Sequence, residues 1–233
     1  MPLLLMEGRL LSPMLICLQE SSGNFGPNVQ NSMYKPVNLV IKCSRSGKMD
    51  KEMMRDFVVN VVQPNIIDDK VCLILDSWSG QSDNLLYDLP GKTIVVKTIP
   101  AGATSFMQPL DIFCFRQWKY FVKKFTEDIM LNDYQINMHL RDNVIQLNSL
   151  ILNQLQSDLF TPMLKYAWHK GGFPIESIAR YESVNEICFE IPAHSCSQNC
   201  TNLPFICCSY RNCRKFLCLP CFFTKNHGHS NSN

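Results

Sequence analysis

Residues 71–76 read VCLILD, and residues 93–111 read TIVVKTIPAGATSFMQPLD. Both stretches begin with a continuous apolar run of the length and composition of a buried β-strand. The first run is followed by Asp76, and the loop after the second run leads to Asp111, where a helical pattern starts. In α/β sheets, ligands and catalytic groups lie beyond the carboxyl ends of the strands. We therefore expect the two strands to pair side by side and to bring both carboxylates to one edge of the sheet.

Two convergent carboxylates have a specific chemical use. They are hard oxygen ligands, which suit Mg²⁺ ions that keep open positions for phosphate. The alternative is structural, because aspartate is favoured at helix N-termini. In that case Asp111 caps its helix and Asp76 caps the loop after its strand.

Strands alternate with helices on both sides of this stretch, which is typical of an α/β domain. Apolar residues at helical spacing predict a helix from Asp50 to Val62 that Pro64 ends. The other predicted elements are a β-hairpin of 3–6 and 14–18 around the turn-like EGR, a strand at 37–41, a helical turn at 83–89, and helices from Asp111, at 135–155 and at 158–169, closed by Gly171 and Gly172. The 135–155 helix is expected to bury Ile136, Leu140, Val144, Leu147, Leu150 and Ile151.

The two opening stretches together resemble the DDE transposases of the mariner/pogo group. In that group the second acid closes a hydrophobic strand in an LLLD-type motif, and this chain has LILD ending at Asp76. The third acid follows a phrase ending in QP(L/M)D, which is formed here by Pro100, Thr104, Ser105, Gln108, Pro109, Leu110 and Asp111. The likeness extends over the first 170 or so of the 233 residues.

The resemblance implies an RNase H-like mixed sheet flanked by helices. It also implies that acids hold Mg²⁺ (or Mn²⁺) ions, which promote in-line attack of water or a 3′-hydroxyl on a phosphodiester. Asp76 would be the second acid and Asp111 the third. The partner would be DNA, and the location would be nuclear.

The first acid of that group closes the first strand, upstream of the predicted hairpin. The early acids Glu7 and Glu20 do not match that position, and the helix-turn-helix region that reads transposon ends is not matched either. We therefore expect this chain alone to be catalytically incomplete and to bind magnesium poorly. The alternative is a non-enzymatic protein that binds DNA, chromatin or a protein partner through its C-terminal tail.

Basic side chains follow Asp111 along the predicted helix. Arg116, Lys119, Lys123 and Lys124 fall largely on one side of it, with Phe115, Trp118 and Phe121 among them. In a transposase such a face would lie along the DNA backbone, where each neutralised phosphate releases counterions. The alternative is a solvated basic face over an aromatic core stripe.

The tail, which we define as residues 196–229, is rich in cysteine and histidine. Thiolates and imidazoles at such short spacings suit tetrahedral Zn²⁺, and a module of this size has too little core to fold without metal. The best single site combines Cys208, Cys213, Cys218 or Cys221, and His227 or His229, and a second site using Cys196 and Cys200 stays open. Disulfides are the alternative, with the sequon Asn199-Cys200-Thr201 as weak support for secretion.

Composition limits the remaining possibilities. The net charge is only +2, so nucleic-acid binding must rest on local patches. Glu7, Arg9 and Pro13 interrupt the apolar start, which argues against a signal peptide, and no apolar run is long enough to predict a membrane span. The expected units are 1–130, a partial RNase H-like DDE domain that lacks the first strand; 131–173, a helical extension; 174–195, a linker; and 196–229, the zinc-binding module.

Overall fold

The computed structural model describes residues 1–176, 178 and 180–229. Strand β1 (Met14–Gln19) pairs in parallel with β2 (Leu39–Ser44), and β3 (Lys70–Leu75) pairs in parallel with β4 (Thr93–Thr98). In the tail, β5 (Ile206–Cys207) pairs antiparallel with β6 (Phe216–Leu217). The α/β class is therefore confirmed. The continuous RNase H-like sheet that we expected is not formed, because the described strands make three separate two-stranded sheets.

The predicted N-terminal hairpin has different partners in the structure. Leu4 forms an antiparallel bridge with Leu10, and Gly8 adopts a positive φ of 82° in the turn between them, a conformation that glycine adopts at little cost. The run at 14–18 is a strand, as expected, but it pairs with β2 instead of with residues 3–6. Periodicity identifies a strand without specifying its partner, so this part of the prediction was wrong.

The helix predicted at 50–62 begins as expected and continues past its predicted end. The side chain of Asp50 caps α2 (Lys51–Phe57) by accepting the N–H of Met53 at 2.8 Å. A π-helical turn (Val58–Val62) leads into α3 (Gln63–Asn65). Pro64 does not end the helix, because it lies in the first turn of α3, where its missing N–H is tolerated.

Long helices dominate the second half of the chain. They are α5 (Phe115–Leu131), α6 (Arg141–Leu155) and α7 (Thr161–Lys170), preceded by the short α1 (Pro27–Ser32) and α4 (Thr104–Met107). The predicted start of α6 at residue 135 was wrong: residues 135–140 are a loop. Leu140 at its end is 57% exposed instead of buried. The helix α7 ends at Gly171 as predicted.

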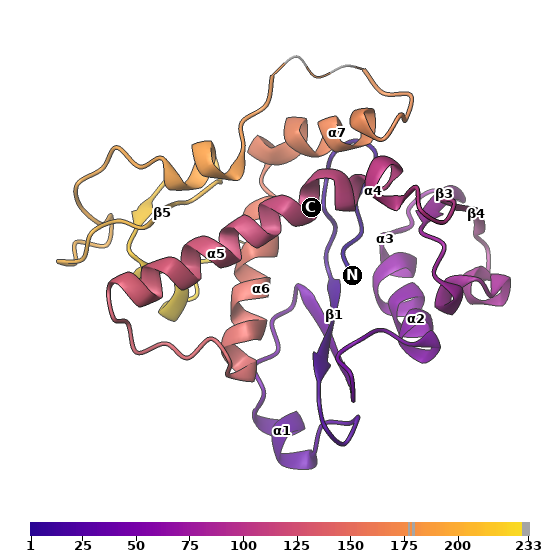
Figure 1. Cartoon of the computed structure of the whole chain (residues 1–233), viewed down its shortest axis with the longest axis horizontal. Coiled ribbons are helices and arrows are strands. Elements are labelled where there is room, and N and C mark those ends of the chain that lie inside the picture. The colour runs from indigo at the N-terminus through magenta and orange to yellow at the C-terminus, as the bar shows by residue number, and fades with distance from the viewer. Residues whose placement is uncertain (177, 179, 230–233) are drawn as a thin grey trace.

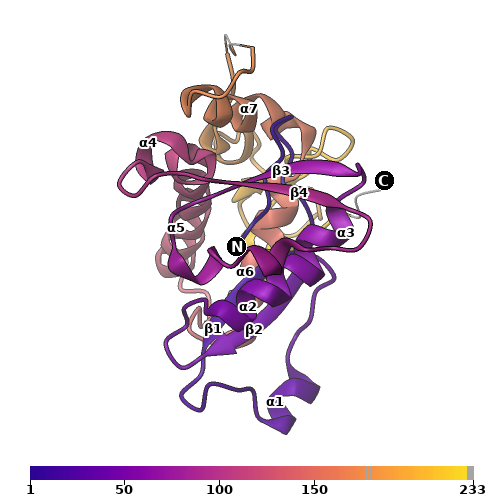
Figure 2. The ribbon, with the colours of Figure 1, turned by 90° about the vertical axis from the view of Figure 1, so that its right-hand side faces the viewer.

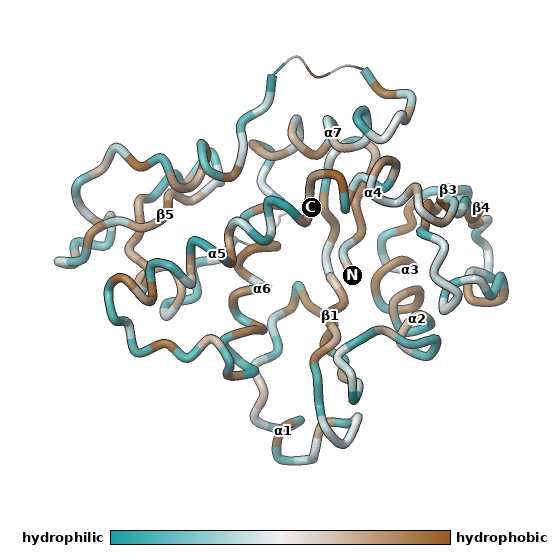
Figure 3. Tube along the Cα trace, viewed as in Figure 1, coloured by the Kyte–Doolittle hydropathy of each residue, from teal (hydrophilic) through white to brown (hydrophobic). Residues whose placement is uncertain are grey.

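Two hydrophobic clusters hold these elements together. The smaller one packs the buried face of α2 and the following π-helical turn against β3 and β4, which lie side by side over α2 in Figure 2. The larger one joins α5, α6 and α7 to the N-terminal segment and to the tail. Along α2 hydrophobic residues alternate with hydrophilic ones (Figure 3), as expected of a helix that buries one face. In α6, every residue from Ser149 to Leu155 is buried.

The tail shares the larger cluster and has no separate core among the described residues. Phe125 of α5 is fully buried, and its ring centroid lies 4.9 Å from that of Phe205, 5.6 Å from that of Phe222 and 6.2 Å from that of Phe223. Figure 1 shows the tail, in yellow, beside α5 and α6. Three aromatic residues of the tail thus pack around one residue of α5, so the tail and the helices that follow Asp111 share one core.

Candidate active site and metal centres

Asp76 directly follows β3 and is fixed by its neighbours. Its Oδ1 accepts the backbone N–H of Trp78 at 3.0 Å, and the side-chain amide of Gln81 donates both to Oδ1 and, at 2.9 Å, to the Asp76 carbonyl. Gln81 is buried, and its own carbonyl accepts the hydroxyl of Tyr87 at 2.8 Å. The carboxylate of Asp76 is therefore held in one orientation by a buried amide.

Asp111 lies in the π-helical turn Leu110–Cys114 that precedes α5. Pro109 occupies the N-cap position, and no side-chain capping hydrogen bond is formed there. The structural alternative is therefore wrong for Asp111, which caps no helix, but it is confirmed for Asp76, which caps the loop after β3 by accepting the N–H of Trp78. Its backbone N–H donates to the Gln108 carbonyl at 3.0 Å, and its carboxylate is exposed.

Asp76 lies near enough to Asp111 for its charge to affect the pKa of Asp111. The ladder between β3 and β4 continues to its carboxyl end, where the N–H of Ile99 donates to the carbonyl of Leu75 at 2.7 Å. Burial raises the pKa of Asp111 above its usual value, the charge of Asp76 raises it further, and Lys119 lowers it. Two carboxylates that repel each other in this way are a donor set that a divalent cation neutralises.

The described residues bring no third ligand to this pair. The groups of three or more cysteine, histidine or carboxylate side chains with mutual ligand distances within 4.8 Å both lie in the tail. The same phrase as Asp111 holds one buried acceptor without a partner among the described groups. The side-chain oxygen of Gln108 is buried and accepts no hydrogen bond from any described group, which is costly for a buried acceptor.

The basic side chains expected to face DNA are on α5. Arg116, Lys119 and Lys123 are exposed, whereas Lys124 is half-buried, with its Nζ 5.5 Å from the centre of the Tyr120 ring. Lys123 pairs with Glu127 at 3.6 Å. The aromatic residues of the same helix point elsewhere: Phe121 is buried, and the Trp118 indole N–H donates to Asn148 of α6 at 3.1 Å.

The first tail group consists of four thiols. Cys196, Cys200, Cys218 and Cys221 have sulfur atoms within 4.8 Å of one another, and the Cys200 sulfur lies 3.4 Å from that of Cys218 and 3.8 Å from that of Cys221. Four thiolates at 2.3 Å from one tetrahedral Zn²⁺ are separated by about 3.8 Å. All twelve cysteines are free, so the disulfide alternative is not what the structure shows.

The second tail group consists of two thiols and two imidazoles. Cys208, Cys213, His227 and His229 also lie within the 4.8 Å limit, with 3.1 Å from the Cys208 sulfur to His229 Nε2 and 3.5 Å from the Cys213 sulfur to His227 Nε2. The structure thus assigns all eight predicted ligands to two separate groups, whereas the sequence had combined members of both in one site. The pairs of the two groups alternate along the chain.

Burial shifts the pKa values of most ligands in both groups. Burial raises the pKa of Cys208 and of Cys218 to about 12. Burial also acts to raise the pKa of Cys196, but hydrogen bonds from the N–H groups of Cys218 and Gln198 outweigh it and lower this pKa to about 7. Burial lowers the pKa of His227 and of His229 below its usual value. The imidazoles are therefore neutral at pH 7, as metal ligands must be, and a bound Zn²⁺ would deprotonate the thiols.

Comparison with known proteins bears on the part of the chain before the tail. The family model described as DDE superfamily endonuclease matches residues 4–180. The chain therefore belongs to the DDE superfamily endonuclease family, and the expected resemblance is confirmed. No curated protein and no solved structure matches the chain. Within the described residues, no helix has both the length and the apolar character needed to cross a bilayer.

Two buried side-chain amides contact these sites but belong to none of the sequence motifs that predicted them. Gln81 orients Asp76, and Gln154 of α6 contacts the second tail group. The available signal for Gln154 is its position, because it is a polar residue within the apolar helical run LILNQL. Such a residue is expected to be hydrogen-bonded when it is buried.

Proposed function

We propose that this chain is a transposase-derived DDE domain that binds DNA in the nucleus, with a divalent cation between Asp76, Asp111 and a backbone phosphate. The observation that supports the proposal is that the charge of Asp76, directly after β3, raises the pKa of Asp111 in the turn before α5, in a chain of the DDE family. The oxygen donor set fits Mg²⁺ or Mn²⁺, since both prefer carboxylates and retain positions for water and phosphate.

The residues around the pair have distinct tasks in this proposal. Gln81 holds the Asp76 carboxylate, and Lys119, which lies close enough to lower the pKa of Asp111, supplies positive charge where a phosphate would approach. A bound Mg²⁺ would stabilise the negative charge that develops on the phosphate oxygens during phosphodiester cleavage. The described part of the chain provides two carboxylates instead of three, so we propose that this chain alone binds DNA without cutting it efficiently.

The exposed basic side chains of α5 support the DNA-binding part of the proposal. Arg116, Lys119 and Lys123 follow one another at helical spacing and continue from the side of Asp111 along one face of α5. They would contact phosphates and contribute affinity without sequence specificity. The i,i+4 pair of Lys123 with Glu127 is exposed and costs little to break.

Neutralising this face should weaken DNA binding and reduce its salt dependence. Replacement of Arg116, Lys119 and Lys123 by Gln removes three phosphate contacts, so the slope of log K against log salt concentration should fall by about 3. Fluorescence anisotropy with a labelled DNA duplex over a salt series measures both quantities. The matched control replaces the exposed Lys48, Lys51 and Lys70 by Gln, which changes the net charge equally. Equal losses in the two triple variants would contradict a binding face on α5.

We further propose that the tail binds two structural Zn²⁺ ions, one in each group of four ligands. The supporting observation is that both groups have the donor types, the number and the spacing of closed tetrahedral sites. The ligand pairs of the two groups alternate along the chain. The two pairs that bind one ion would therefore have a pair of the other ion between them in the sequence. Neither group is then expected to form independently of its neighbour.

A further inference from the structure

Gln154 of α6 is a polar side chain in the centre of the protein. It is fully buried, and it lies beside the second tail group, which consists of Cys208, Cys213, His227 and His229. Its Oε1 accepts the backbone N–H of Ser209 at 2.8 Å and the Ser209 hydroxyl at 2.9 Å. Its Nε2 donates to the sulfur of Cys208 at 3.8 Å. A residue of the DDE domain therefore contacts a proposed zinc ligand directly.

The orientation of this amide follows from its partners. A backbone N–H can only donate, so the side-chain oxygen of Gln154 must face Ser209 and its NH₂ group must face Cys208. A neutral thiol is a weak acceptor for a buried NH₂ group, whereas a thiolate forms a charge-assisted hydrogen bond. Without a metal ion Cys208 is a neutral thiol, because burial raises its pKa to about 12; a metal-bound thiolate would be the stronger acceptor for the NH₂ group of Gln154.

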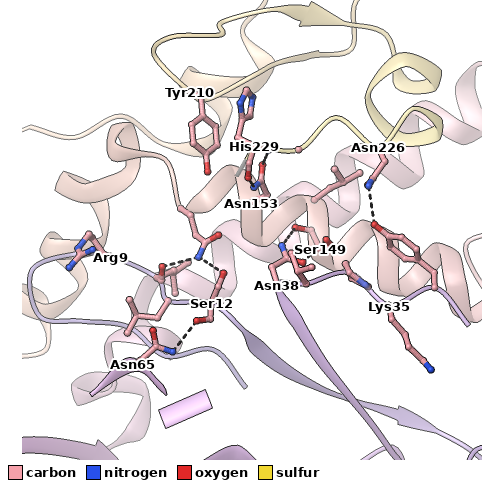
Figure 4. A pocket seen from close by; sticks show the side chains of 18 of the residues that line it. Arg9, Ser12, Lys35, Asn38, Asn65, Ser149, Asn153, Tyr210, Asn226 and His229 are labelled. Carbon is pink, nitrogen blue, oxygen red and sulfur yellow. Dashed lines mark hydrogen bonds between the residues drawn. The ribbon is translucent and has the colours of Figure 1, made fainter. Parts of the chain in front are cut away.

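Asn153, the preceding residue of α6, holds the other end of the same group. Its Oδ1 accepts the backbone N–H of His229 at 2.9 Å, and its Nδ2 donates to the His229 carbonyl at 2.6 Å. Figure 4 shows Asn153 and His229 close together, with Tyr210 beside His229. All three residues line a pocket of about 1230 Å³. Two adjacent residues of α6 thus position two of the four ligands.

The first tail group, Cys196, Cys200, Cys218 and Cys221, has no comparable attachment within the described residues. The hydrogen bonds that its sulfur atoms accept come from the tail itself, from the N–H of Cys218 to Cys196 at 3.4 Å and from Asn202 to Cys218 at 3.9 Å. The two groups therefore differ in how they are connected to the DDE domain. Only the second is hydrogen-bonded to α6 through its ligands.

We propose that Gln154 is a positioning residue of the second zinc site, and that it donates to the Cys208 thiolate so that the bound ion joins the tail to α6. This inference rests on the proposed binding of two Zn²⁺ ions by the tail. Outer hydrogen bonds of this type orient ligands and tune the metal. The second Zn²⁺ would then act as an internal cross-link between the tail and the domain that carries Asp111.

The test is competition for zinc by a chromophoric chelator, applied to the zinc-loaded wild-type protein and to two variants. Gln154→Met keeps the volume but removes the donor to Cys208, and we expect one of the two Zn²⁺ ions to be released about 10 to 100 times more readily. The matched control, Ser209→Ala, removes a hydroxyl from the same buried contacts but leaves the Gln154 amide facing Cys208. It should change the affinity of neither site appreciably. With Co²⁺ in place of Zn²⁺, Gln154→Met should also shift the thiolate-to-cobalt absorption of the second site only.

The outcomes separate the inference from the zinc proposal on which it rests. A wild-type protein that binds no Zn²⁺ would contradict the zinc proposal. Two tightly bound ions in both wild type and Gln154→Met would overturn the role of Gln154 alone, as would equal weakening of both sites. A purely structural role would lower the melting temperature at every zinc concentration. A positioning role predicts that added free Zn²⁺ reduces that deficit, because ligand binding stabilises the folded state by mass action.

Discussion

Removal of zinc is expected to unfold the tail and to loosen the helices that pack against it. Structural Zn²⁺ sites of this type contribute a large part of the folding free energy of small modules, and the tail contributes Ile206, Leu217 and Phe222 to the larger hydrophobic cluster. Excess chelator should therefore lower the melting temperature by more than about 10 °C. Circular dichroism in the near ultraviolet, recorded with and without chelator, measures the loss of aromatic packing.

Single cysteine substitutions provide the control for this experiment. Cys200→Ser removes a ligand of the first tail group and should reproduce most of the effect of the chelator. It should also weaken the second group, because the ligand pairs alternate along the chain. Cys72→Ser alters an exposed thiol of β3 outside both groups and should leave the transition unchanged. A chelator effect of less than a degree would show that zinc does not hold the tail.

Phe125→Ala is expected to be the most damaging single substitution that leaves every proposed ligand in place. The Phe125 ring is fully buried and contacts three aromatic rings of the tail. Truncation of a buried Phe to Ala typically lowers the free energy of unfolding by 3–5 kcal/mol, from lost transfer free energy and from the cavity that remains. Urea denaturation of the zinc-loaded protein, monitored by tryptophan fluorescence, measures the change.

Met130→Ala is the matched control on the same helix. Met130 is 76% exposed, so its truncation should change the free energy of unfolding by less than about 0.5 kcal/mol. If Phe125→Ala were equally mild, the tail would not share the core of α5 and α6, and its zinc sites would form a module independent of the DDE domain. If the account is right, Phe125→Ala also makes zinc easier to remove.

The features that sequence analysis predicted well are local. The apolar runs of β3 and β4 are strands of nearly the expected extent that lie side by side, in parallel. Their expected burial was wrong, because Leu75 alone is buried in these two strands, which form a separate two-stranded sheet. The charge of Asp76 raises the pKa of Asp111, whereas a shared metal site at the two carboxylates stays a prediction. Both strands are continuous apolar segments bounded by turn residues, so local pattern alone is sufficient to identify them.

The features that sequence analysis missed depend on contacts between distant segments. The partner of β1 is chosen by tertiary packing, so the expected hairpin with residues 3–6 was wrong. The division of eight tail ligands between two groups follows from the β5–β6 hairpin, which separates Cys208 from the thiols of the first group. The hydrogen bond from Gln154 to Cys208 joins residues that are 54 positions apart in the sequence. None of these pairings has a periodic or compositional signal.

Mn²⁺ binding is the decisive test of a metal site at Asp76 and Asp111, measured by electron paramagnetic resonance of the free ion after the tail has been loaded with Zn²⁺. We expect one weak site in the wild type, lost in both Asp76→Asn and Asp111→Asn but kept in Asp68→Asn. Asp68 is an exposed acid just before the other end of β3, so it controls for charge.

The raised pKa of Asp111 also predicts how the substitution Asp111→Asn changes the stability of the folded protein. A carboxyl group whose pKa is higher in the folded than in the unfolded protein destabilises the folded state increasingly as pH rises through that interval. Without a divalent cation, Asp111→Asn should therefore be at least as stable as the wild type at pH 7. Loss of Mn²⁺ binding in both Asn variants of the pair, without loss of stability, is the expected result. Mn²⁺ binding that neither substitution alters would contradict a carboxylate-pair metal site in this DDE domain.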